Sequence, residues 1–188
     1  VFTTSQCLLA PHRSQPMTKD DIEQRLKEAL RAEHVVWLDH GNLVGDDTDG
    51  HIDTIVRTAP ENTLLYVGCD DSHDEQYEDF LALEHQLMSL RTSTGMPYRL
   101  LRLPMPDAIY DEGERLPATY ANFLIINGAV ICPTYAQPEK DKQALQTIAQ
   151  AYPDREAIGI DARTVIKQHG SLHCLTMQFP QGVIANNP

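Results

Sequence analysis

Three residues of the 188-residue chain have side chains that could carry out covalent chemistry together, namely Cys174, His51 and Asp53. A cysteine attacks an electrophile as its thiolate, which nearby positive charge favours, and a neighbouring histidine can protonate the leaving group. A carboxylate two residues beyond that histidine in a strand lies on the same face and could bind a cation. The three residue types therefore fit nucleophilic catalysis by Cys174, provided that the fold brings them together across 121 to 123 residues.

Each of these residues also has a simpler interpretation. His51 follows the acidic run Asp46–Asp49, which fits a turn with a solvated histidine, or a weak Ca²⁺-like loop with the wrong downstream spacing for an EF-hand. His-x-Asp also begins the facial triad of non-haem iron oxygenases, but those enzymes use an all-β jelly roll. His169, His173 and Cys174 could be metal ligands, although adjacent His and Cys lack the Cys-x₂-Cys spacing typical of zinc sites.

The spacing of the cysteines indicates how the chain is organised. Cys69 follows Cys7 by 62 residues, Cys132 follows Cys69 by 63, and each of the three closes an apolar, strand-like run. Free cysteines in such runs behave as small buried hydrophobic residues. Cys174 follows Cys132 by only 42 residues and breaks the series. A period of about 60 residues is typical of repeated supersecondary units, and Cys174 is the cysteine that the repeat does not explain.

A helix pattern follows each of the three apolar runs. Thr18 can cap the first helix, whose apolar residues recur at every fourth position. Ser72 and Glu75 have the spacing of a capping box for the second helix. The third helix pattern begins near Glu139 and ends before Pro153, because proline cannot continue a helix.

Strands are predicted on both sides of these helices. The runs before the helices are residues 1–7, 64–69 and 129–132, and the runs after them are residues 35–38, 98–103 and 157–161. Two further strands, 51–57 and 120–126, open the second and third units, and a strand over 171–176 begins a fourth. The dipeptide Asn127-Gly128 predicts a type I′ hairpin after the second of these opening strands.

The repeated unit is therefore strand–strand–helix–strand, which predicts an α/β fold in one domain over residues 1–188. Its approximate units are 1–45, 46–112, 113–168 and the start of a fourth at 169–188. The first unit lacks its opening strand and the fourth lacks its helix, so we expect the chain to be a section of a longer repeat array. If the units surround an axis, their equivalent strand starts converge and bring Cys174 to the other two candidate residues.

The amino-acid composition limits the kinds of partner that the chain could bind. The chain has 15 Lys and Arg against 27 Asp and Glu, a net charge of −12, whereas binding to nucleic acid needs clustered basic residues. No run approaches the ~18 apolar residues of a membrane span, so we expect neither a nucleic-acid nor a membrane partner. Four cysteines are too few for a small secreted disulfide scaffold, which favours a cytoplasmic location. The strand edges of an incomplete array would favour self-association into a homo-oligomer.

Several stretches of the chain resemble the agmatine deiminase and peptidyl-arginine deiminase-like family of guanidine-modifying enzymes, which have the pentein α/β-propeller fold. These stretches include Asp47–Thr54, Tyr120–Phe123, Asn127–Val130 and His173–Thr176. The Gly-His-Ile-Asp and His-Cys-x-Thr motifs are highly specific in this order and spacing. The resemblance runs almost from end to end. It implies that the chain is the C-terminal half of such an enzyme, with about three of five propeller blades.

The resemblance also implies a reaction. Cys174 would attack the guanidinium carbon of a small cationic guanidine such as agmatine, and the thiouronium intermediate would be hydrolysed to N-carbamoylputrescine, on the route to putrescine. His51 would protonate the departing nitrogen and then activate water, and Asp53 would bind the guanidinium. Asp47 and Gly170 are further candidates for substrate binding, since Gly170 lies in the loop expected to cover the site. No metal and no organic cofactor are expected.

Two departures from the family pattern bear on activity. The sequence Gln168-His169-Gly170-Ser171 replaces a glycine-rich run before the His-Cys pair. The Asp-x-Trp-x-Arg-Asp and Glu-Gly-Gly motifs, which supply two more guanidinium-binding acids in related enzymes, do not occur in this sequence. Burying a guanidinium beside too few carboxylates is costly, so we expect this chain alone to be inactive or weakly active. The alternatives are a deiminase of free or peptidyl arginine, and a non-catalytic propeller fragment that acts as a binding module.

Overall fold

The structure, a computed structural model, describes residues 1–180, 182 and 183, so part of the predicted unit 169–188 lies outside the described residues. In chain order the elements are β1 (Phe2–Thr4), α1 (Ser5–Leu8), α2 (Lys19–Leu30), β2 (Val36–Leu38), β3 (Val56–Ala59), β4 (Thr63–Gly68), α3 (Tyr77–Ser89), β5 (Arg99–Pro104), β6 (Tyr110–Asp111), β7 (Glu114–Arg115), β8 (Leu124–Ile126), β9 (Ala129–Thr134), α4 (Pro138–Ala151) and β10 (Glu156–Asp161). Short 3₁₀ turns lie at Ile52–Thr54, Val165–Gln168 and His173–Leu175.

Residues 56–104 and 124–161 have the same topology. In the first, β3 is antiparallel to β4, and β4 is parallel to β5 across α3; in the second, β8 is antiparallel to β9, and β9 is parallel to β10 across α4. Parallel neighbours need a crossover connection, which the two helices provide. The predicted strand–strand–helix–strand order is therefore confirmed in these two segments, and the fold is mixed α/β with small, open sheets.

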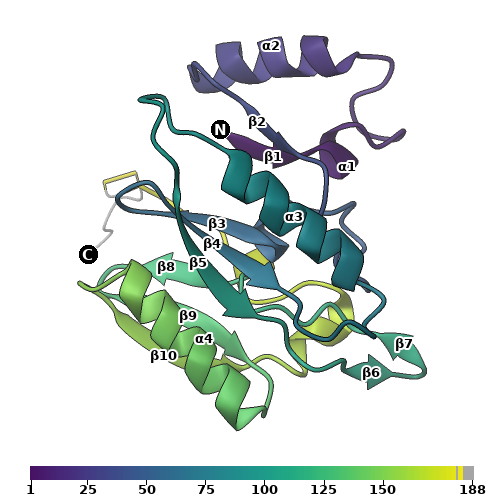
Figure 1. Cartoon of the computed structure of the whole chain (residues 1–188), viewed down its shortest axis with the longest axis vertical. Helices are drawn as coiled ribbons and strands as arrows, with labels where there is room; N and C mark the ends of the chain where they lie inside the picture. Colours follow the sequence, from purple (N-terminus) through teal and green to yellow (C-terminus); the bar gives the residue numbers. More distant parts are fainter. Residues whose placement is uncertain (181, 184–188) are drawn as a thin grey trace.

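Residues 1–38 form a smaller unit in which β1 and β2 pair in parallel across α2. Figure 1 shows the three units in succession along the long axis of the molecule, with α2, α3 and α4 in chain order from top to bottom. The predicted strand over 1–7 ends at Thr4, because the Thr4 hydroxyl accepts the N–H of Cys7 at 3.2 Å and caps α1 instead. Cys7 is therefore buried in a helix and not in a strand, contrary to the prediction.

The predicted helix limits are confirmed where a local cap determines them. The Thr18 hydroxyl accepts the N–H of Asp21 at 3.2 Å, and the Asp21 carboxylate accepts the N–H of Thr18 at 2.9 Å, which completes a capping box. α4 has proline in its first turn and ends at Ala151, before Pro153. The capping box predicted at Ser72 for α3 is wrong, because that helix begins only at Tyr77. None of the helices in the described residues is long and apolar enough to span a membrane.

The two predicted opening strands are only partly strands. Residues 51–55 turn through a 3₁₀ conformation before β3, because the Thr54 hydroxyl donates to the His51 carbonyl at 2.7 Å and the Thr54 carbonyl accepts from the Thr119 hydroxyl at 2.6 Å. Residues 120–123 are irregular, and the carbonyls of Ala121 and Phe123 accept hydrogen bonds from a side chain in place of a neighbouring strand. Such side-chain bonds compete with the sheet ladder and end it.

Two further local predictions are wrong. Residues 171–176 contain a 3₁₀ turn and no strand, because the N–H of His173 donates to the Asn122 carbonyl at 3.2 Å. The hairpin between β8 and β9 has the predicted two-residue loop, since Ile126 pairs with Ala129. Gly128 has a left-handed φ of 80°, whereas Asn127 does not have a positive φ, so the turn is not type I′.

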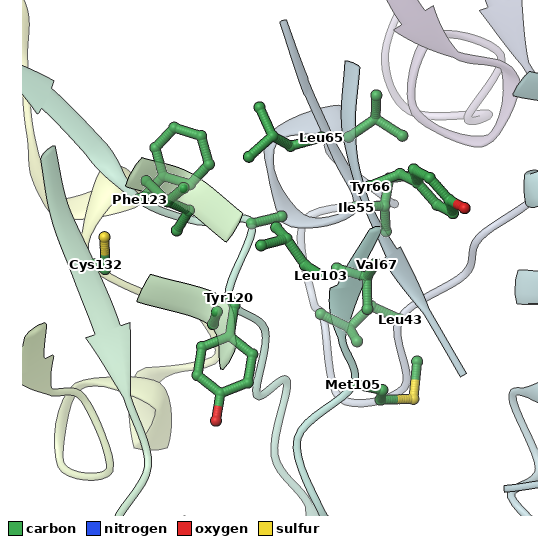
Figure 2. Packing of buried hydrophobic residues seen from close by; sticks show 14 of the residues in the cluster. Leu43, Ile55, Leu65, Tyr66, Val67, Leu103, Met105, Tyr120, Phe123 and Cys132 are labelled. Carbon is green, nitrogen blue, oxygen red and sulfur yellow. The ribbon is translucent and has the colours of Figure 1, made fainter. Parts of the chain in front are cut away.

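The second and third units share one hydrophobic core. Figure 2 shows Tyr120 and Phe123 beside Leu103, at the junction between these units, and each of the three is fully buried or nearly so. Tyr152, at the end of α4, donates its hydroxyl proton to the Thr58 carbonyl in β3 at 2.9 Å. The junction therefore holds the loops that precede β3 and β8 in fixed positions, and these loops carry two residues of the candidate site, Asp53 and Asn122.

Candidate active site

Cys174 lies in the 3₁₀ turn His173–Leu175 and is exposed, whereas the other three cysteines are buried. Its backbone N–H donates to the Asn122 side-chain oxygen at 3.3 Å, and its sulfur lies 3.4 Å from the Asn122 side-chain nitrogen. An exposed thiol can meet a solute and react, while a buried thiol is only a packing group. The structure therefore separates Cys174 from the other cysteines in the same way as the spacing did.

Asn122 is completely buried and uses both ends of its amide in the site. Its Oδ1 accepts the N–H of His173 at 2.9 Å as well as that of Cys174, and its Nδ2 donates to Asp53 Oδ2 at 2.9 Å. One side chain thus fixes the thiol-bearing turn and the carboxylate relative to each other. The sequence prediction omitted this residue, although a polar asparagine within the apolar run Tyr120–Phe123 is itself a signal.

Asp53 faces the thiol. Its Oδ2 lies 4.0 Å from the Cys174 sulfur and 2.6 Å from His173 Nδ1. Among the described residues, no hydrogen bond to Asp53 Oδ1 is found. Burial alone would raise the pKa of Asp53, but the hydrogen bond from His173 and the positive charges of His173 and Arg57 outweigh it and hold the pKa below its ordinary value. The site therefore offers an ionised carboxylate with one oxygen available to a cation.

His51 lies two residues before Asp53, but its ring is held by another partner. Its Nε2 is 2.9 Å from Arg13 Nη2. A guanidinium can only donate, so Nε2 accepts this bond and a neutral ring carries its proton on Nδ1. Within the described part of the chain, no hydrogen bond joins His51 to Cys174. The prediction that alternation in a strand aligns His51 with Asp53 is wrong, because residues 52–54 form a 3₁₀ turn.

The acidic run before His51 divides into residues with different roles. The Asp46 carboxylate accepts bonds from the Thr48 hydroxyl at 2.7 Å and from the Gly50 N–H at 2.9 Å, so it shapes the loop. Asp49 is 2.7 Å from His12. Asp47 is exposed and has no hydrogen bond or ion pair to any described residue, so its role in substrate binding stays a prediction. No group of three or more His, Cys, Asp or Glu in the described residues could hold a metal ion.

At two positions in the site, a glycine allows neighbouring parts of the chain to pack closely. A Cβ on Gly170 would lie 3.2 Å from Cys174 Cβ and 3.6 Å from its sulfur, so Gly170 leaves the space beside the thiol open. Gly50 has a φ of 73°, which disfavours other residues, and its carbonyl accepts the Thr4 hydroxyl at 2.6 Å. His169 ties the Gly170 loop to the acidic run, because its Nδ1 is 2.7 Å from the Gly45 carbonyl. The structure thus places Gly170 beside Cys174, and its role in substrate binding stays a prediction.

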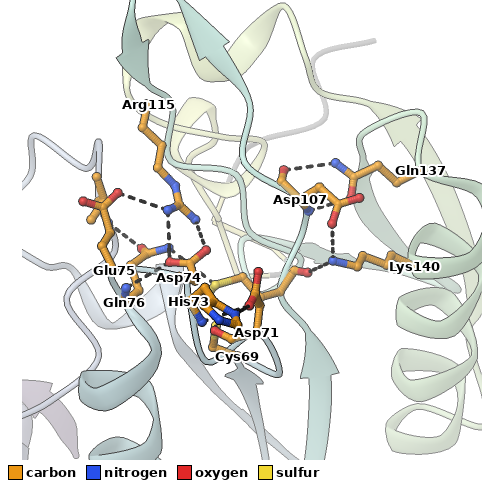
Figure 3. Close-up of polar contacts among 12 residues, drawn as sticks. Cys69, Asp71, His73, Asp74, Glu75, Gln76, Asp107, Arg115, Gln137 and Lys140 are labelled. Atoms are coloured by element: carbon orange, nitrogen blue, oxygen red, sulfur yellow. Dashed lines mark hydrogen bonds and ion pairs between the residues drawn. The ribbon is translucent and has the colours of Figure 1, made fainter.

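A second cluster in the molecule combines a cysteine, carboxylates and an arginine (Figure 3). Cys69 is buried beyond β4, and its sulfur is 3.6 Å from the Asp71 carbonyl, to which the thiol donates. Asp74 forms a two-pronged ion pair with Arg115, at 2.7 and 3.0 Å, and Glu75 adds a third contact at 3.1 Å. Burial raises the pKa of Cys69 above its ordinary value. This thiol is therefore protonated and packed at neutral pH.

Comparisons with known proteins find matches over nearly the whole chain. The model of the Porphyromonas-type peptidyl-arginine deiminase family matches residues 1–180. A curated relative from Marinomonas sp. (strain MWYL1), provisionally named an agmatine deiminase, is 35% identical over 198 residues, which cover 96% of this chain and 53% of the relative. The chain spans about half the length of the curated relatives it matches.

Solved structures of deiminases also match nearly the whole chain. A crystal structure from Porphyromonas gingivalis, provisionally named an arginine deiminase, has a TM-score of 0.93 and 53% identity and covers 96% of this chain and 53% of that one. A Cys-to-Ser variant of the C. jejuni agmatine deiminase with substrate bound has a TM-score of 0.85 and 40% identity, covering 92% and 50%. Both matches extend over nearly the whole of this chain.

Proposed function

Because the chain belongs to the Porphyromonas-type peptidyl-arginine deiminase family, we propose that the protein hydrolyses the guanidinium group of agmatine, giving N-carbamoylputrescine and ammonia. The observation that carries the proposal is the carboxylate of Asp53, which lies 4.0 Å from the Cys174 sulfur with no hydrogen bond to its Oδ1 among the described residues. A carboxylate oxygen beside a thiol suits a planar guanidinium, because it can bind an N–H while the carbon faces the sulfur.

In this proposal Cys174 is the nucleophile. Its thiolate forms a bond to the guanidinium carbon, and the C=N π pair moves onto nitrogen to give a tetrahedral adduct. His51, as an imidazolium released from Arg13, donates a proton to the nitrogen that leaves. The C–N bond breaks and ammonia departs, leaving a cationic thiouronium and a neutral imidazole. His51 then takes a proton from water as that water attacks the same carbon. When the C–S bond breaks, the hydroxyl proton of the adduct passes to solvent, where it protonates the ammonia. This leaves the ureido product and regenerates the thiolate and the imidazolium.

The other parts of the site hold this chemistry in place. Asp53 binds the substrate cation, and Asn122 keeps the turn that carries the nucleophile beside Asp53 through its bonds of 2.9 and 3.3 Å. Gly170 leaves room for the substrate beside the sulfur, and Asp47 is a candidate for the other end of the dication. Thiolate, imidazole and carboxylate provide the groups that this mechanism uses. The C. jejuni agmatine deiminase holds bound substrate as a Cys-to-Ser variant, which fits a cysteine that is needed for turnover.

We also propose that residues 1–188 form a single domain that is one part of a larger pentein propeller, with units at 1–45, 46–112, 113–168 and 169–188. The matching topologies of 56–104 and 124–161 support a repeat, and the half-length coverage of the relatives supports a larger assembly. In such a propeller further acids would reach the guanidinium. We therefore expect slow turnover by the 188 residues alone, in a cytoplasmic protein that supplies putrescine synthesis.

A second candidate substrate is arginine, free or within a peptide. It is favoured by the family description and by the P. gingivalis structure, whose provisional name is arginine deiminase. Arginine differs from agmatine by an α-carboxylate, which a basic residue in the pocket would have to bind. The net charge of −12 makes the agmatine dication the better match.

The test is to incubate the 188-residue chain and the protein encoded by the whole gene with agmatine, arginine and a peptidyl-arginine. Colorimetry of the ureido group measures turnover. We expect agmatine to be the best substrate of the whole protein, with at least about tenfold less turnover by the 188 residues, since uncompensated buried charge is costly. If the whole protein prefers arginine, arginine replaces agmatine as the proposed substrate. If none of the three substrates gives a ureido product, both candidate functions are overturned. A thermal-shift titration with agmatine shows binding independently.

A further inference from the structure

We propose that Arg57 is a positioning residue for the nucleophile: its guanidinium holds the backbone on both sides of Asn122, and Asn122 in turn fixes the turn that carries Cys174. This inference deepens the proposed function and rests on it for its catalytic readout. Its structural basis is independent of the substrate. Arg57 comes from β3, and neither the sequence motifs nor the pattern of polar loops singles it out.

The first step of the argument is the pair of bonds that Arg57 makes. One nitrogen, Nη1, donates to the Ala121 carbonyl at 3.1 Å and to the Phe123 carbonyl at 2.6 Å. The centre of the guanidinium lies 4.4 Å from the centre of the Phe123 ring, in a cation–π contact. These carbonyls lie immediately before and after Asn122. In this irregular segment the charged side chain replaces the adjacent strand that would otherwise fix the backbone.

The second step is what Asn122 transmits. Its amide meets the N–H groups of His173 and Cys174, the Cys174 sulfur and the Asp53 carboxylate, at distances of 2.9 to 3.4 Å. A fully buried amide with so many short contacts cannot rotate without breaking several of them. A shift of its backbone therefore moves the thiol relative to the carboxylate. Displacements of about 1 Å in such constellations can lower rates by about 10²-fold.

The third step is charge. In the described chain, Arg57 forms no ion pair with a carboxylate, and its bonds to carbonyls leave its positive charge uncancelled. Burial lowers the pKa of Arg57, and the negative charge of Asp53 acts in the opposite direction. Arg57 remains a cation at neutral pH because an arginine side chain keeps its proton under these conditions. A buried cation repels a cationic substrate, so we expect the benefit of Arg57 in the chemical step and not in substrate binding.

This division of effects distinguishes a positioning role from a purely structural one. Three variants test it: Arg57→Met removes the donors and the charge, Arg57→Lys keeps a cation that can donate to both carbonyls, and Arg91→Met is the matched control. Arg91 Nη1 also donates to two backbone carbonyls, at 3.0 and 2.7 Å, but it lies in the exposed segment after α3. Melting temperatures of all variants monitor the fold.

The activity-independent measurement is the rate at which iodoacetamide alkylates Cys174 at neutral pH, with the site identified by mass spectrometry. The thiol lies 4.0 Å from Asp53 Oδ2 and 3.4 Å from Asn122 Nδ2, and the substitution at Arg57 changes neither of these residues. For Arg57→Met we expect alkylation to slow about tenfold, because Asn122 no longer fixes the turn that presents the thiol. Arg57→Lys should restore the rate to within about threefold, and Arg91→Met should leave it unchanged.

The kinetic measurement uses the form of the protein that deiminates agmatine. For Arg57→Met we expect kcat to fall about 10²-fold with KM within about threefold of its original value. Unchanged alkylation in a folded Arg57→Met protein, or failure of Arg57→Lys to recover, would overturn the inference. If Arg57→Met does not fold, Arg57→Gln, whose shorter side chain lacks the reach of Arg57 Nη1, takes its place with the same expected direction. If no variant deiminates, alkylation still decides on Arg57, so this inference and the proposed function fail separately.

Discussion

The site around Cys174 and the cluster around Cys69 contain the same kinds of residue and differ in how the arginine is used. At Cys69, Arg115 binds the Asp74 carboxylate directly through two short bonds, and both side chains are at least 86% buried (9% and 14% exposed). At Cys174, Arg57 binds two backbone carbonyls, and the Asp53 carboxylate retains an oxygen that no described residue bonds. A carboxylate satisfied by arginine stabilises the fold, whereas one left partly unsatisfied beside a thiol can receive a ligand.

The two cysteines follow the same division. Burial raises the pKa of Cys69, whose thiol donates to a neighbouring carbonyl at 3.6 Å, so that sulfur is neutral and inaccessible. Cys174 is exposed, and its sulfur lies 4.0 Å from the Asp53 carboxylate. The presence of a cysteine near acidic residues is therefore not sufficient to indicate a reactive site. Exposure and the partner of the arginine distinguish the two clusters.

The largest expected effect is on turnover when the two thiols are removed separately. Cys174→Ala should lower kcat for agmatine by at least about 10⁴-fold, as loss of a covalent nucleophile does. Cys69→Ala should leave kcat within about threefold and cost about 1 kcal/mol of unfolding free energy, because it removes only a small packed group. Ureido colorimetry and urea denaturation measure the two quantities. Equal activity of both variants would remove the contrast between the clusters.

Removing the imidazole beside the site should have the next largest effect. His51→Gln keeps a polar side chain that can accept from Arg13 but cannot transfer a proton, so we expect kcat to fall about 10²- to 10⁴-fold. His85→Gln is the matched control, because His85 is an exposed histidine on α3. A His51→Gln protein with kcat within fivefold of the original (a threshold of roughly 1 kcal/mol) would remove His51 from the mechanism.

Neutralising the two carboxylates should separate binding from stability. For Asp53→Asn we expect KM for agmatine to rise about 10- to 100-fold, because a charge-assisted hydrogen bond to the guanidinium becomes a neutral one. Asp74→Asn, the equivalent change in the Cys69 cluster, should leave KM unchanged. Steady-state kinetics at neutral pH measure both. A rise in KM for Asp74→Asn alone would mean that the substrate binds at the Cys69 cluster.

The smallest expected effect is on stability. Asp74→Asn should cost about 2–3 kcal/mol of unfolding free energy at neutral pH, since it leaves Arg115 largely buried without its partner. Burial raises the pKa of Asp74, but its bonds with Arg115 and Gln76 outweigh this and hold the pKa below the ordinary 3.8. The stabilisation is therefore complete above pH 3.8 and is lost as the pH falls through the lower folded value.

Urea denaturation across this pH range measures the difference between the original protein and Asp74→Asn. The difference should shrink below pH 3.8, the ordinary value for the group. Asp161→Asn is the control, because Asp161 also forms a two-pronged pair, with Arg163, but both side chains are about half exposed (51% and 53%). Such surface pairs contribute at most about 1 kcal/mol. An equal cost for the two variants would contradict the role of burial.

The parts of the fold that could be predicted from the sequence are those fixed by neighbouring residues. α2 has its cap in Thr18 and Asp21, α4 has proline at its start and Pro153 after its end, and β2, β5 and β10 are apolar runs. Periodicity and caps act over a few residues, so a single sequence contains them. The specific spacing of the cysteines also identified Cys174 as exceptional, and the structure gives it a distinct, exposed position.

The rest depends on contacts that are remote in the sequence. The strand predicted over 51–57 begins late because Thr54 bonds to Thr119, 65 residues away. Asn122 was omitted because its partners lie 51 to 69 residues from it, and nothing local marks Arg57 as their support. The contact between Arg13 and His51 spans 38 residues. Hydrophobic patterning does not encode which polar side chains contact one another. Those contacts determine the geometry of the candidate site.

The two sheets of like topology have a consequence for the order in which the molecule forms and comes apart. Residues 56–104 and 124–161 each complete their sheet from one continuous segment, whereas Asp53, Asn122 and Cys174 all lie outside these segments. Each sheet can therefore gain its hydrogen bonds before the site exists, and the site arises only when the segments dock. In mild denaturant, catalytic competence should vanish while amides in the central strands β4 and β9 still resist exchange with deuterium.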